Sequence, residues 1–301
     1  LTKLRNIQLC KKIKKKATVV LSGCGADELF CGYGRIFTSV EDYNQLTKKN
    51  QKFLNNQFLN NVKLRYGKLN FKNELDHFLS IYPYTKIELK KKLLNNTFDH
   101  FRIEKNIKNY FQSIFKKINS KKYIDKMQYF FQKYHLKGIL EREDISSMAA
   151  GVELRVPFLD HRIVQYSTQI PYHYKIKKIK KSLNLTSDKT SEVLDINKYI
   201  LKETFKNKIP TKIIRRKKVG FPVPLHEWIE NKYVKKLIFQ TLLSKKSKKR
   251  GIFNIQYIEE LLNKKKLNHF KGDSRVYQNS IAAKIWMCFN LECFFLNQDN
   301  K

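Results

Sequence analysis

The chain has 301 residues, of which 42% are hydrophobic and 13% aromatic, so it holds enough apolar material for a packed core and general disorder is excluded. Its 62 lysines and arginines against 26 acidic residues give a net charge of +36, which would suit a polyanionic partner. The lysine runs are spread over the whole chain, however, and Asn, Ile, Phe and Tyr are also abundant, as in proteins of AT-rich genomes. We therefore interpret the charge as a compositional bias, and expect neither a nucleic-acid partner nor a membrane partner.

The five cysteines indicate a reducing compartment. They are scattered, form no CxxC pair and share no zinc-ligand spacing with histidines. We expect free thiols and a cytoplasmic location. The most apolar late stretch, 281–296, is interrupted by Lys284, Asn290 and Glu292 and is too polar to span a bilayer. We recognise no signal peptide. Because the chain begins at Leu1 and not at a methionine, we expect it to be a fragment of a longer protein.

The first predicted element is a short strand at 17–21, after a solvated lysine run at 11–16. Its β-branched residues favour a buried strand of a parallel sheet. From residue 40 to about residue 120 the pattern is helical and polar. A lone strand needs sheet partners, so we expect the rest of the sheet to lie before residue 1.

The second half is predicted to be mostly helical. Residues 125–142 form the clearest amphipathic helix, because apolar residues recur there at i, i+3, i+4 and i+7. Pro157 stops one element, and Asp160 can cap the next helix. A polar loop is expected over 175–195, and further helices are expected over 198–209 and 275–296. The chain as a whole is therefore predicted to be α/β and predominantly helical.

Four of the ten glycines lie within twelve residues, in the stretch ATVVLSGCGADELFCGYGR (17–35). A glycine-rich loop after a strand brings backbone N–H groups against phosphate oxygens, because glycine has no Cβ and tolerates positive φ. Asp27 follows Gly23 by four residues, and a carboxylate beside a phosphate loop indicates Mg²⁺. Glu28 is a second candidate acid. The pattern is neither GxGxxG nor a P-loop, so a tight turn with Asp27 as N-cap remains an alternative.

Two later segments accompany this loop. SMAAGVELRVPFLDHRIVQ (147–165) groups Glu153, Arg155 and Asp160 around a proline, which also fits a salt-bridged structural corner. RRKKVGFPVPLHEW (215–228) places four consecutive cations beside a glycine. A lysine there could neutralise a leaving pyrophosphate, and a solvated charge run is the alternative.

Together, these segments resemble the C-terminal synthetase domain of glutamine-hydrolysing asparagine synthetases. The resemblance implies an α/β domain of the ATP-pyrophosphatase type over 1–301, incomplete at its N-terminal side because the glutaminase domain and the SGGxDS phosphate loop would precede it. It also implies ATP, Mg²⁺, aspartate and ammonia or glutamine as cofactors and substrates. ATP would adenylate the aspartate side chain, and ammonia would give asparagine, AMP and pyrophosphate. A glutaminase domain in the parent chain is implied as partner, and a homodimer is compatible with the resemblance.

The resemblance also assigns site residues by position. The matched positions are Ser22, Gly23, Gly25 and Lys218 for the nucleotide, Asp27 for Mg²⁺, and Cys24, Glu28, Arg142 and Lys218 for catalysis. Typical family members have an acidic residue at the position of Cys24, and a thiol with a reference pKa of about 8.5 is a poor substitute for it. The pair Glu153 and Arg155 is expected to be structural.

Other functions stay open on the sequence alone. One is an amidotransferase of the same type acting on another carboxylate. Another is a catalytically degenerate homologue that kept the fold as a basic binding protein, which the charge and Cys24 would favour. Plain nucleic-acid binding is a third.

Overall fold

The computed structural model of the chain describes residues 2–47, 54–82, 87–97, 99–179, 185–191, 193–216, 225–263 and 281–299. The chain folds into two compact units. The first comprises Leu1–Ile81 and Phe111–Phe221, and the second Tyr82–Tyr110 and Pro222–Lys301.

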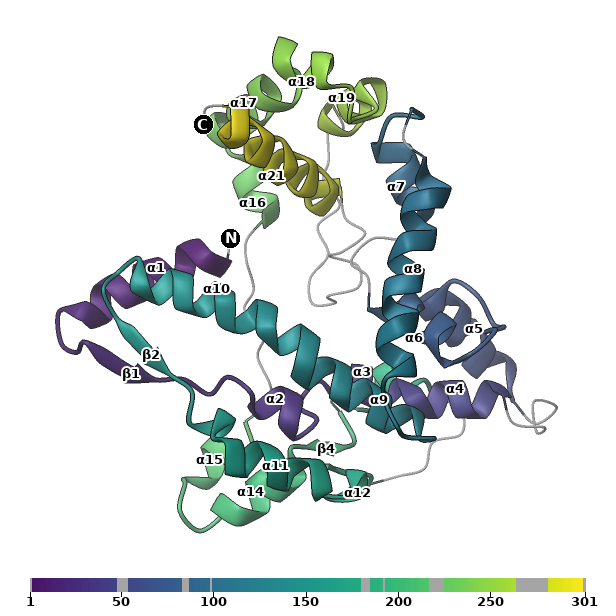
Figure 1. Ribbon diagram of the computed structural model, residues 1–301, viewed down its shortest axis with the longest axis vertical. Coiled ribbons are helices and arrows are strands. Elements are labelled where there is room, and N and C mark those ends of the chain that lie inside the picture. Colours follow the sequence, from purple (N-terminus) through teal and green to yellow (C-terminus); the bar gives the residue numbers. More distant parts are fainter. Residues whose placement is uncertain are drawn as a thin grey trace. The chain divides into compact units, whose positions relative to one another are not determined.

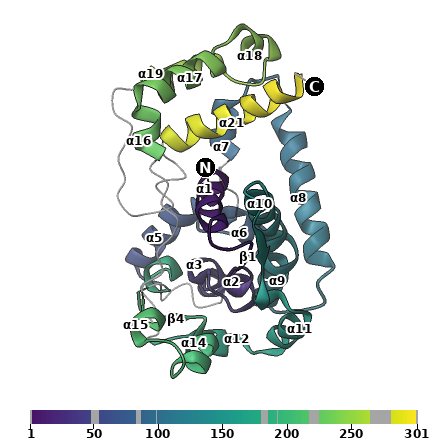
Figure 2. The ribbon, with the colours of Figure 1, turned by 90° about the vertical axis from the view of Figure 1, so that its left-hand side faces the viewer.

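The first unit is mostly helical, with two small two-stranded sheets (Figure 1). From its first helix to Met148, its elements are α1 (Thr2–Lys14), β1 (Val19–Leu21), α2 (Ala26–Leu29), α3 (Gly34–Phe37), α4 (Ser39–Thr47), α5 (Asn56–Tyr66), α6 (Glu74–Ile81), the last turns of α8 (His100–Lys116), α9 (Tyr123–Phe130), a π-helical turn (Phe131–His135) and α10 (Leu136–Met148). There follow β2 (Glu153–Arg155), a 3₁₀ turn (Pro157–Leu159), α11 (His161–Gln169), α12 (Tyr172–Lys175), β3 (Ile176–Lys177), α13 (Ser187–Thr190), β4 (Ile196–Asn197), α14 (Tyr199–Phe205) and α15 (Thr211–Ile214). Figure 2 shows α12 beside α14, the two helices that adjoin β3.

The second unit is helical in its described part. It contains α7 (Ile87–Leu93), the first turns of α8, α16 (Leu225–Glu230), α17 (Lys232–Leu242), α18 (Lys245–Arg250), α19 (Ile255–Asn263) and α21 (Ile281–Asp299). Helix α21 packs against α16, α17 and α19 and is the late helix predicted from the sequence. Within the described residues, no helix combines the length and apolar character that a bilayer crossing needs.

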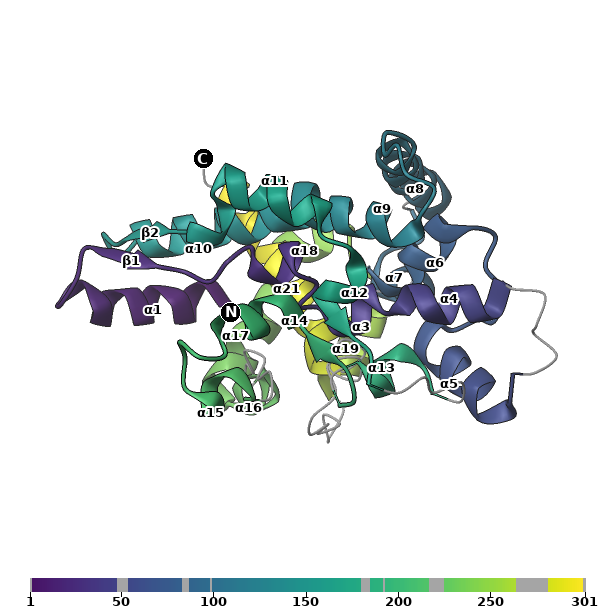
Figure 3. The same ribbon diagram turned by 90° about the horizontal axis from the view of Figure 1, so that it is seen from below.

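The predicted strand β1 pairs in parallel with β2, with Val19 opposite Glu153 and Leu21 opposite Arg155. Helix α10 packs against both α1 and β2, and Figures 1 and 3 show these helices alongside the two strands. The parallel pairing confirms the strand and its type. The expectation that its sheet partners lie before residue 1 was wrong for β2, which follows β1 in the chain. The pairing places the loop that follows β1 next to the segment that follows β2.

The prediction that β1 is buried was wrong. The side chains of Val19 and Leu21 are 44% and 74% exposed. Residues two apart in a strand share a face, so both lie on one face of the sheet, and no described element covers that face. The apolar run reports strand propensity correctly, but its burial depends on what packs against it.

The amphipathic helix predicted over 125–142 is confirmed and is longer than expected. Helix α9, the π-helical turn and α10 follow one another without a break. Met127, Phe130 and Phe131 are buried by at least 98%. A π-helical turn adds one residue to the repeat, so the core-facing side of α10 is displaced relative to that of α9.

Two local predictions missed structure. The lysine-rich stretch before β1 belongs largely to helix α1, where Lys14 donates from Nζ to the carbonyl oxygen of Gly151 at 2.7 Å. The polar region around 175–195, expected to be a loop, contains β3 and α13. Tertiary contacts stabilise both, and such contacts override weak local propensity.

A buried histidine lies in an aromatic cluster of the first unit. His77 of α6 is fully buried, and its Nδ1 lies 2.7 Å from the hydroxyl oxygen of Tyr123. The rings of Tyr43, Tyr66 and Phe71 surround it, with centroids 5.2, 4.9 and 4.9 Å away. Burial lowers the pKa of His77 to about 3. The folded state therefore holds this imidazole neutral.

This histidine should make the protein less stable in mild acid. In the unfolded chain His77 is protonated below a pH of about 6.5, whereas in the folded chain it is protonated only below a pH of about 3. The free energy of unfolding therefore falls as the pH falls from about 6.5 to about 3. We expect His77 to cost about 2 kcal/mol at about pH 5 relative to neutral pH. Urea unfolding at both pH values would measure it. His77→Phe should remove this part of the pH dependence, and the exposed His161→Gln should keep it. Equal slopes in wild type and His77→Phe would contradict the prediction.

Candidate functional site

The glycine-rich loop begins where β1 ends. The backbone N–H of Ser22 donates to the carbonyl oxygen of Arg155 at 2.7 Å, and the N–H of Cys24 donates to the Ser22 hydroxyl at 3.2 Å. Gly23 lies exposed between them, and a Cβ built on it would meet no atom within 4 Å. The backbone at Gly23 therefore faces open space, as a loop that receives a ligand requires.

Gly25 is required for a different reason. It precedes α2 with φ of +90°, and a Cβ on it would overlap the side chain of Leu159, with Cγ at 2.8 Å. The left-handed backbone and the close approach of the segment after β2 both require a residue without a side chain. The absence of a side chain at Gly25 therefore allows the loop to pack directly against the segment that follows β2.

We expect Gly25→Ala to lower the free energy of unfolding by about 2–4 kcal/mol, from the left-handed backbone together with the overlap on Leu159. Gly23→Ala is the matched control, because its Cβ would meet nothing, and it should cost less than about 1 kcal/mol. Urea unfolding of both variants tests this. Equal losses at the two positions would contradict it.

Asp27 lies in the first turn of α2 and does not cap it. The N-cap is Gly25, which makes no side-chain cap bond, so the alternative of Asp27 as N-cap was wrong. The Asp27 carboxylate pairs with Lys198, with Oδ1 and Nζ 3.0 Å apart, and lies directly against Gly32. The carboxylate is about a quarter exposed, at 27%. It therefore stays accessible at the edge of the loop while a lysine from another segment holds it.

Glu28, the second acid of the loop, is 2% exposed. The hydroxyl of Tyr33 donates to its Oε1 at 2.7 Å. Burial raises the pKa of Glu28, and the Tyr33 bond acts in the opposite direction. This geometry places the Glu28 carboxylate inside the unit.

Cys24 is half-buried, and the carboxylate of Glu143 on α10 is its neighbour. Burial and then Glu143 raise the pKa of the Cys24 thiol to about 12, against a hydrogen bond with Ser22 that lowers it. The Ser22 hydroxyl donates to Glu143 Oε2 at 3.1 Å. The thiol therefore stays protonated at neutral pH, and a carboxylate from a different element accompanies it.

Of the two cationic candidates, Arg142 and Lys218, the described residues include only Arg142. Arg142 precedes Glu143 on α10, and its Nε is buried without a hydrogen-bond partner among the described residues. A buried donor of this kind is costly unless a ligand completes it. Lys218 lies outside the described residues.

The segment after β2 forms the predicted corner. The Asp160 side chain accepts from the backbone N–H of Arg162 at 2.9 Å, so the predicted cap of α11 is confirmed. Arg155 donates from Nε to Glu153 Oε1 at 2.8 Å, and both side chains are more than half exposed. This contact fits the structural role expected for that pair.

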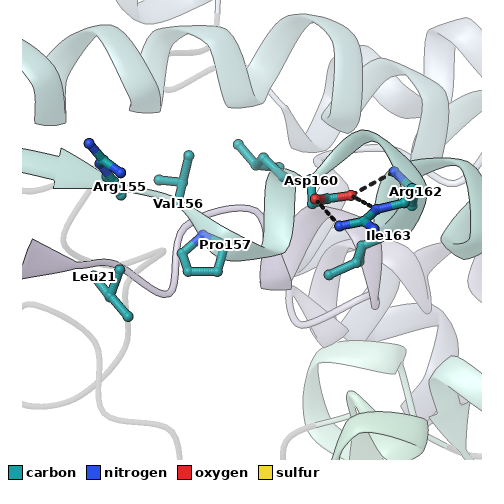
Figure 4. Close-up of a pocket in the computed structure, with 8 residues that line it drawn as sticks. Leu21, Arg155, Val156, Pro157, Asp160, Arg162 and Ile163 are labelled. Carbon is teal, nitrogen blue, oxygen red and sulfur yellow. Dashed lines mark hydrogen bonds and ion pairs between the residues drawn. The ribbon is translucent and has the colours of Figure 1, made fainter.

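An open cavity of about 530 Å³ lies at the carboxyl ends of β1 and β2. Figure 4 shows Leu21 and Pro157 on one side of it and the Asp160–Arg162 pair on the other. The carboxyl ends of parallel strands are the edge at which α/β proteins bind ligands. The cavity and the glycine-rich loop therefore share the edge at which a nucleotide is expected.

The comparison with known families decides what this loop belongs to. Residues 4–288 match the model of the family described as asparagine synthase. The chain belongs to the asparagine synthase family. The predicted fold class, α/β and predominantly helical, is thereby confirmed as that of an ATP-pyrophosphatase-like domain.

Three relatives show how the likeness to asparagine synthases is distributed. "Asparagine synthetase [glutamine-hydrolyzing] 1" of Bacillus subtilis is 26% identical over 301 residues, which covers 97% of this chain and 43% of the relative. The human asparagine synthetase [glutamine-hydrolyzing] is 38% identical over 82 residues, 27% of this chain and 12% of the relative. A putative asparagine synthetase of Methanocaldococcus jannaschii is 52% identical over 40 residues, 13% of this chain and 7% of the relative. The chain thus spans less than half the length of these relatives.

Sequence reasoning missed three residues that surround this loop: Glu143, Lys198 and Tyr33. Glu143 follows Arg142 in the run EREDIS, and its proximity to a candidate residue was a usable signal. Lys198 stands among many lysines of the chain, and no local pattern sets it apart. It is 171 positions from Asp27, so only the folded chain brings the two together.

Proposed function

We propose that this asparagine synthase domain is an ATP-dependent amide-forming ligase. It would adenylate the side-chain carboxylate of aspartate and aminate the adenylate with ammonia derived from glutamine, giving asparagine, AMP and pyrophosphate. The relatives are named glutamine-hydrolysing asparagine synthetases, which supports this reaction. The observation that carries the proposal is the loop from Ser22 to Gly25, which opens toward solvent at the carboxyl end of a parallel strand and is flanked by the Asp27 carboxylate.

The described residues suit the separate tasks of such a reaction. The backbone of Ser22, Gly23 and Gly25 would contact the nucleotide phosphates. The Nε of Arg142, which has no hydrogen-bond partner among the described residues, offers a donor to an anionic substrate. Lys218, which lies outside the described residues, is proposed from the sequence alone to contact the phosphates and reduce the repulsion between two anions, the main electrostatic obstacle to adenylation.

Mg²⁺ is the cofactor implied for ATP. No group of three or more His, Cys, Asp or Glu side chains in the described part of the chain could hold a metal ion by itself. Mg²⁺ on a nucleotide needs only one or two carboxylates, because phosphates and water supply its other ligands. The accessible carboxylate of Asp27 fits that requirement, with Glu28 as its neighbour in sequence. Bound there, Mg²⁺ would neutralise phosphate charge as pyrophosphate leaves.

Pyrophosphate release tests the ligase directly. The natural polypeptide that carries these residues should release pyrophosphate when given ATP, Mg²⁺, aspartate and ammonia, and should form asparagine in equal amount. Omitting aspartate is the control. If no carboxylate supports release, the ligase proposal is overturned. If another carboxylate, such as a sugar or peptide acid, replaces aspartate, the protein is an amidotransferase of the same type.

A degenerate homologue is the second candidate, because the Cys24 thiol is neutral where the family has an acid. In that case the wild-type protein would show no adenylation, and Cys24→Glu would gain it. A wild-type activity that is lost in Asp27→Ala would exclude this candidate. A steep fall of DNA affinity with rising salt would instead point to nucleic-acid binding. We also propose a cytoplasmic location, a glutaminase domain as partner in the parent chain, and a homodimer.

A further inference from the structure

The first half of the glycine-rich loop lies against one carboxylate from outside the loop. Glu143 is half-buried on α10, and it accepts a hydrogen bond from the Ser22 hydroxyl at 3.1 Å. The Cys24 thiol is its second neighbour from the loop. Ser22 in turn accepts from the Cys24 N–H at 3.2 Å, so these three residues form one connected group beside the open backbone of Gly23.

The two acids of the loop itself are engaged elsewhere. Lys198 pairs with Asp27 at 3.0 Å. Glu28 is 2% exposed and accepts from Tyr33 at 2.7 Å. The carboxylate beside Ser22 and Cys24 at the exposed start of the loop is therefore that of Glu143, which belongs to α10 and not to the loop sequence.

Amide formation from ammonia needs a proton acceptor. When ammonia attacks an acyl-adenylate, the nitrogen becomes positively charged and must lose a proton before or as AMP leaves. A neutral thiol cannot accept this proton, whereas an ionised carboxylate can. We propose that Glu143 is the proton acceptor of the amination step in this protein, with Ser22 and Cys24 donating hydrogen bonds that orient its carboxylate. This role rests on the ligase function proposed above.

The step balances as follows. The ammonia nitrogen forms a bond to the acyl carbon, the bond from that carbon to the AMP oxygen breaks with its electron pair going to AMP, and one N–H proton passes to Glu143. The products are the neutral amide, AMP and protonated Glu143, which returns its proton to solvent. No oxidant, reductant or further reactant takes part.

Titratable groups lie close to Glu143 on α1, on the glycine-rich loop and on α10 itself. Cys10 of α1, 5% exposed, lies close enough for Glu143 to raise the pKa of its thiol, after burial as the larger cause. Cys24 faces Glu143 from the loop, and Arg142 precedes Glu143 on α10. Both thiols are protonated at neutral pH, so they can act as donors to the carboxylate.

The decisive variant is Glu143→Gln in the natural polypeptide. Glutamine keeps an acceptor oxygen for the Ser22 hydroxyl but cannot take a proton. Pyrophosphate release from ATP and aspartate without ammonia should stay within about threefold of wild type, while amide formation from the adenylate falls by roughly 100-fold, the usual contribution of a general base. Glu141→Gln is the matched control, because Glu141 lies two residues away on α10 with a 61% exposed side chain. It should keep both half-reactions.

The pH profile separates proton acceptance from support of the loop. With rates expressed per free ammonia, wild-type amination should show an acid limb, in which the rate falls as the pH falls, and Glu143→Gln should lack this limb. The double variant Cys24→Glu/Glu143→Gln should regain amination, because it places a carboxylate on the loop itself.

The outcomes distinguish the two proposals. A wild-type protein that releases no pyrophosphate overturns the ligase, and the role of Glu143 falls with it. An active wild type whose Glu143→Gln variant keeps its amination rate overturns the role of Glu143 alone. So does a variant that loses both half-reactions equally and keeps the acid limb, since that pattern identifies a structural residue.

Discussion

Replacing Asp27 by asparagine is expected to lower the rate of pyrophosphate release by about 100-fold or more, the usual cost of removing one charge-stabilising contact from an active site. Asparagine has nearly the same shape as aspartate but no negative charge, so the loop should fold normally and lose its ligand for Mg²⁺. A titration of the rate with Mg²⁺ measures this, and the variant should need more Mg²⁺ than wild type.

Two further variants make the Asp27 test specific. Lys198→Met removes the cation that holds the same carboxylate at 3.0 Å, so half-saturation should need less Mg²⁺. Glu203 of α14 pairs with Lys206, the residue just after that helix, and their side chains are 46% and 59% exposed, so Glu203→Gln should leave the rate unchanged. An Asp27→Asn variant with the rate and Mg²⁺ response of wild type would show that the metal ligand lies elsewhere.

Replacing Arg65 by methionine should lower the free energy of unfolding by about 3–5 kcal/mol, the cost of leaving buried charges without their partner. Arg65 of α5 lies between two carboxylates, 3.0 Å from Asp42 and 3.3 Å from Asp188, with side-chain exposures of 5%, 2% and 1%. It also donates to the Ser187 hydroxyl and to the carbonyl oxygen of Arg35. This group joins α3, α4, α5 and α13, so its loss affects much of the first unit.

The same variant predicts a dependence on pH. Burial already raises the pKa of Asp42, and Arg65 opposes that shift. Without Arg65, the folded-state pKa of Asp42 rises further above the unfolded value of about 3.9, so the folded variant takes up a proton first as the pH falls. The deficit against wild type should therefore shrink between neutral pH and mild acid.

Urea unfolding over this range measures the Arg65 deficit. Arg162→Met is the matched control, because its ion pair with Asp160 lies at the surface, with 79% of the arginine side chain exposed. It should cost no more than about 1 kcal/mol. A constant Arg65→Met deficit at all pH values would contradict the assigned cause.

Several features of the fold could be predicted because they depend on neighbours in sequence. The apolar run before a glycine cluster predicted β1 and the loop after it, and the repeat of apolar residues predicted the helix that begins at Tyr123. Asp160 as a cap followed from its place after Pro157, since a cap bonds to a backbone N–H two residues away. The conformation of Gly25 likewise agrees with the tolerance of glycine for positive φ.

The candidate site could be predicted only in part. The three segments identified the family, which the match over 4–288 confirmed. They did not show that Glu28 is buried against Tyr33 or that Asp27 is held by Lys198. Those contacts depend on how α2 is seated in the unit, and no spacing within the loop reports that.

The sequence by itself determined the family, the predominantly helical class, and the strand, loop and helix that make up the glycine-rich site, because each rests on local propensity or on a run of consecutive residues. The tertiary structure alone decided which side chains surround that loop. Glu143 reaches Ser22 across 121 positions, and Arg65 reaches Ser187 across 122. Contacts at such separations are formed by the path of the whole chain and the packing of its core, and local sequence carries no record of that path. Cys24 illustrates the difference: the sequence identified a missing acid, and the folded chain placed another carboxylate beside it.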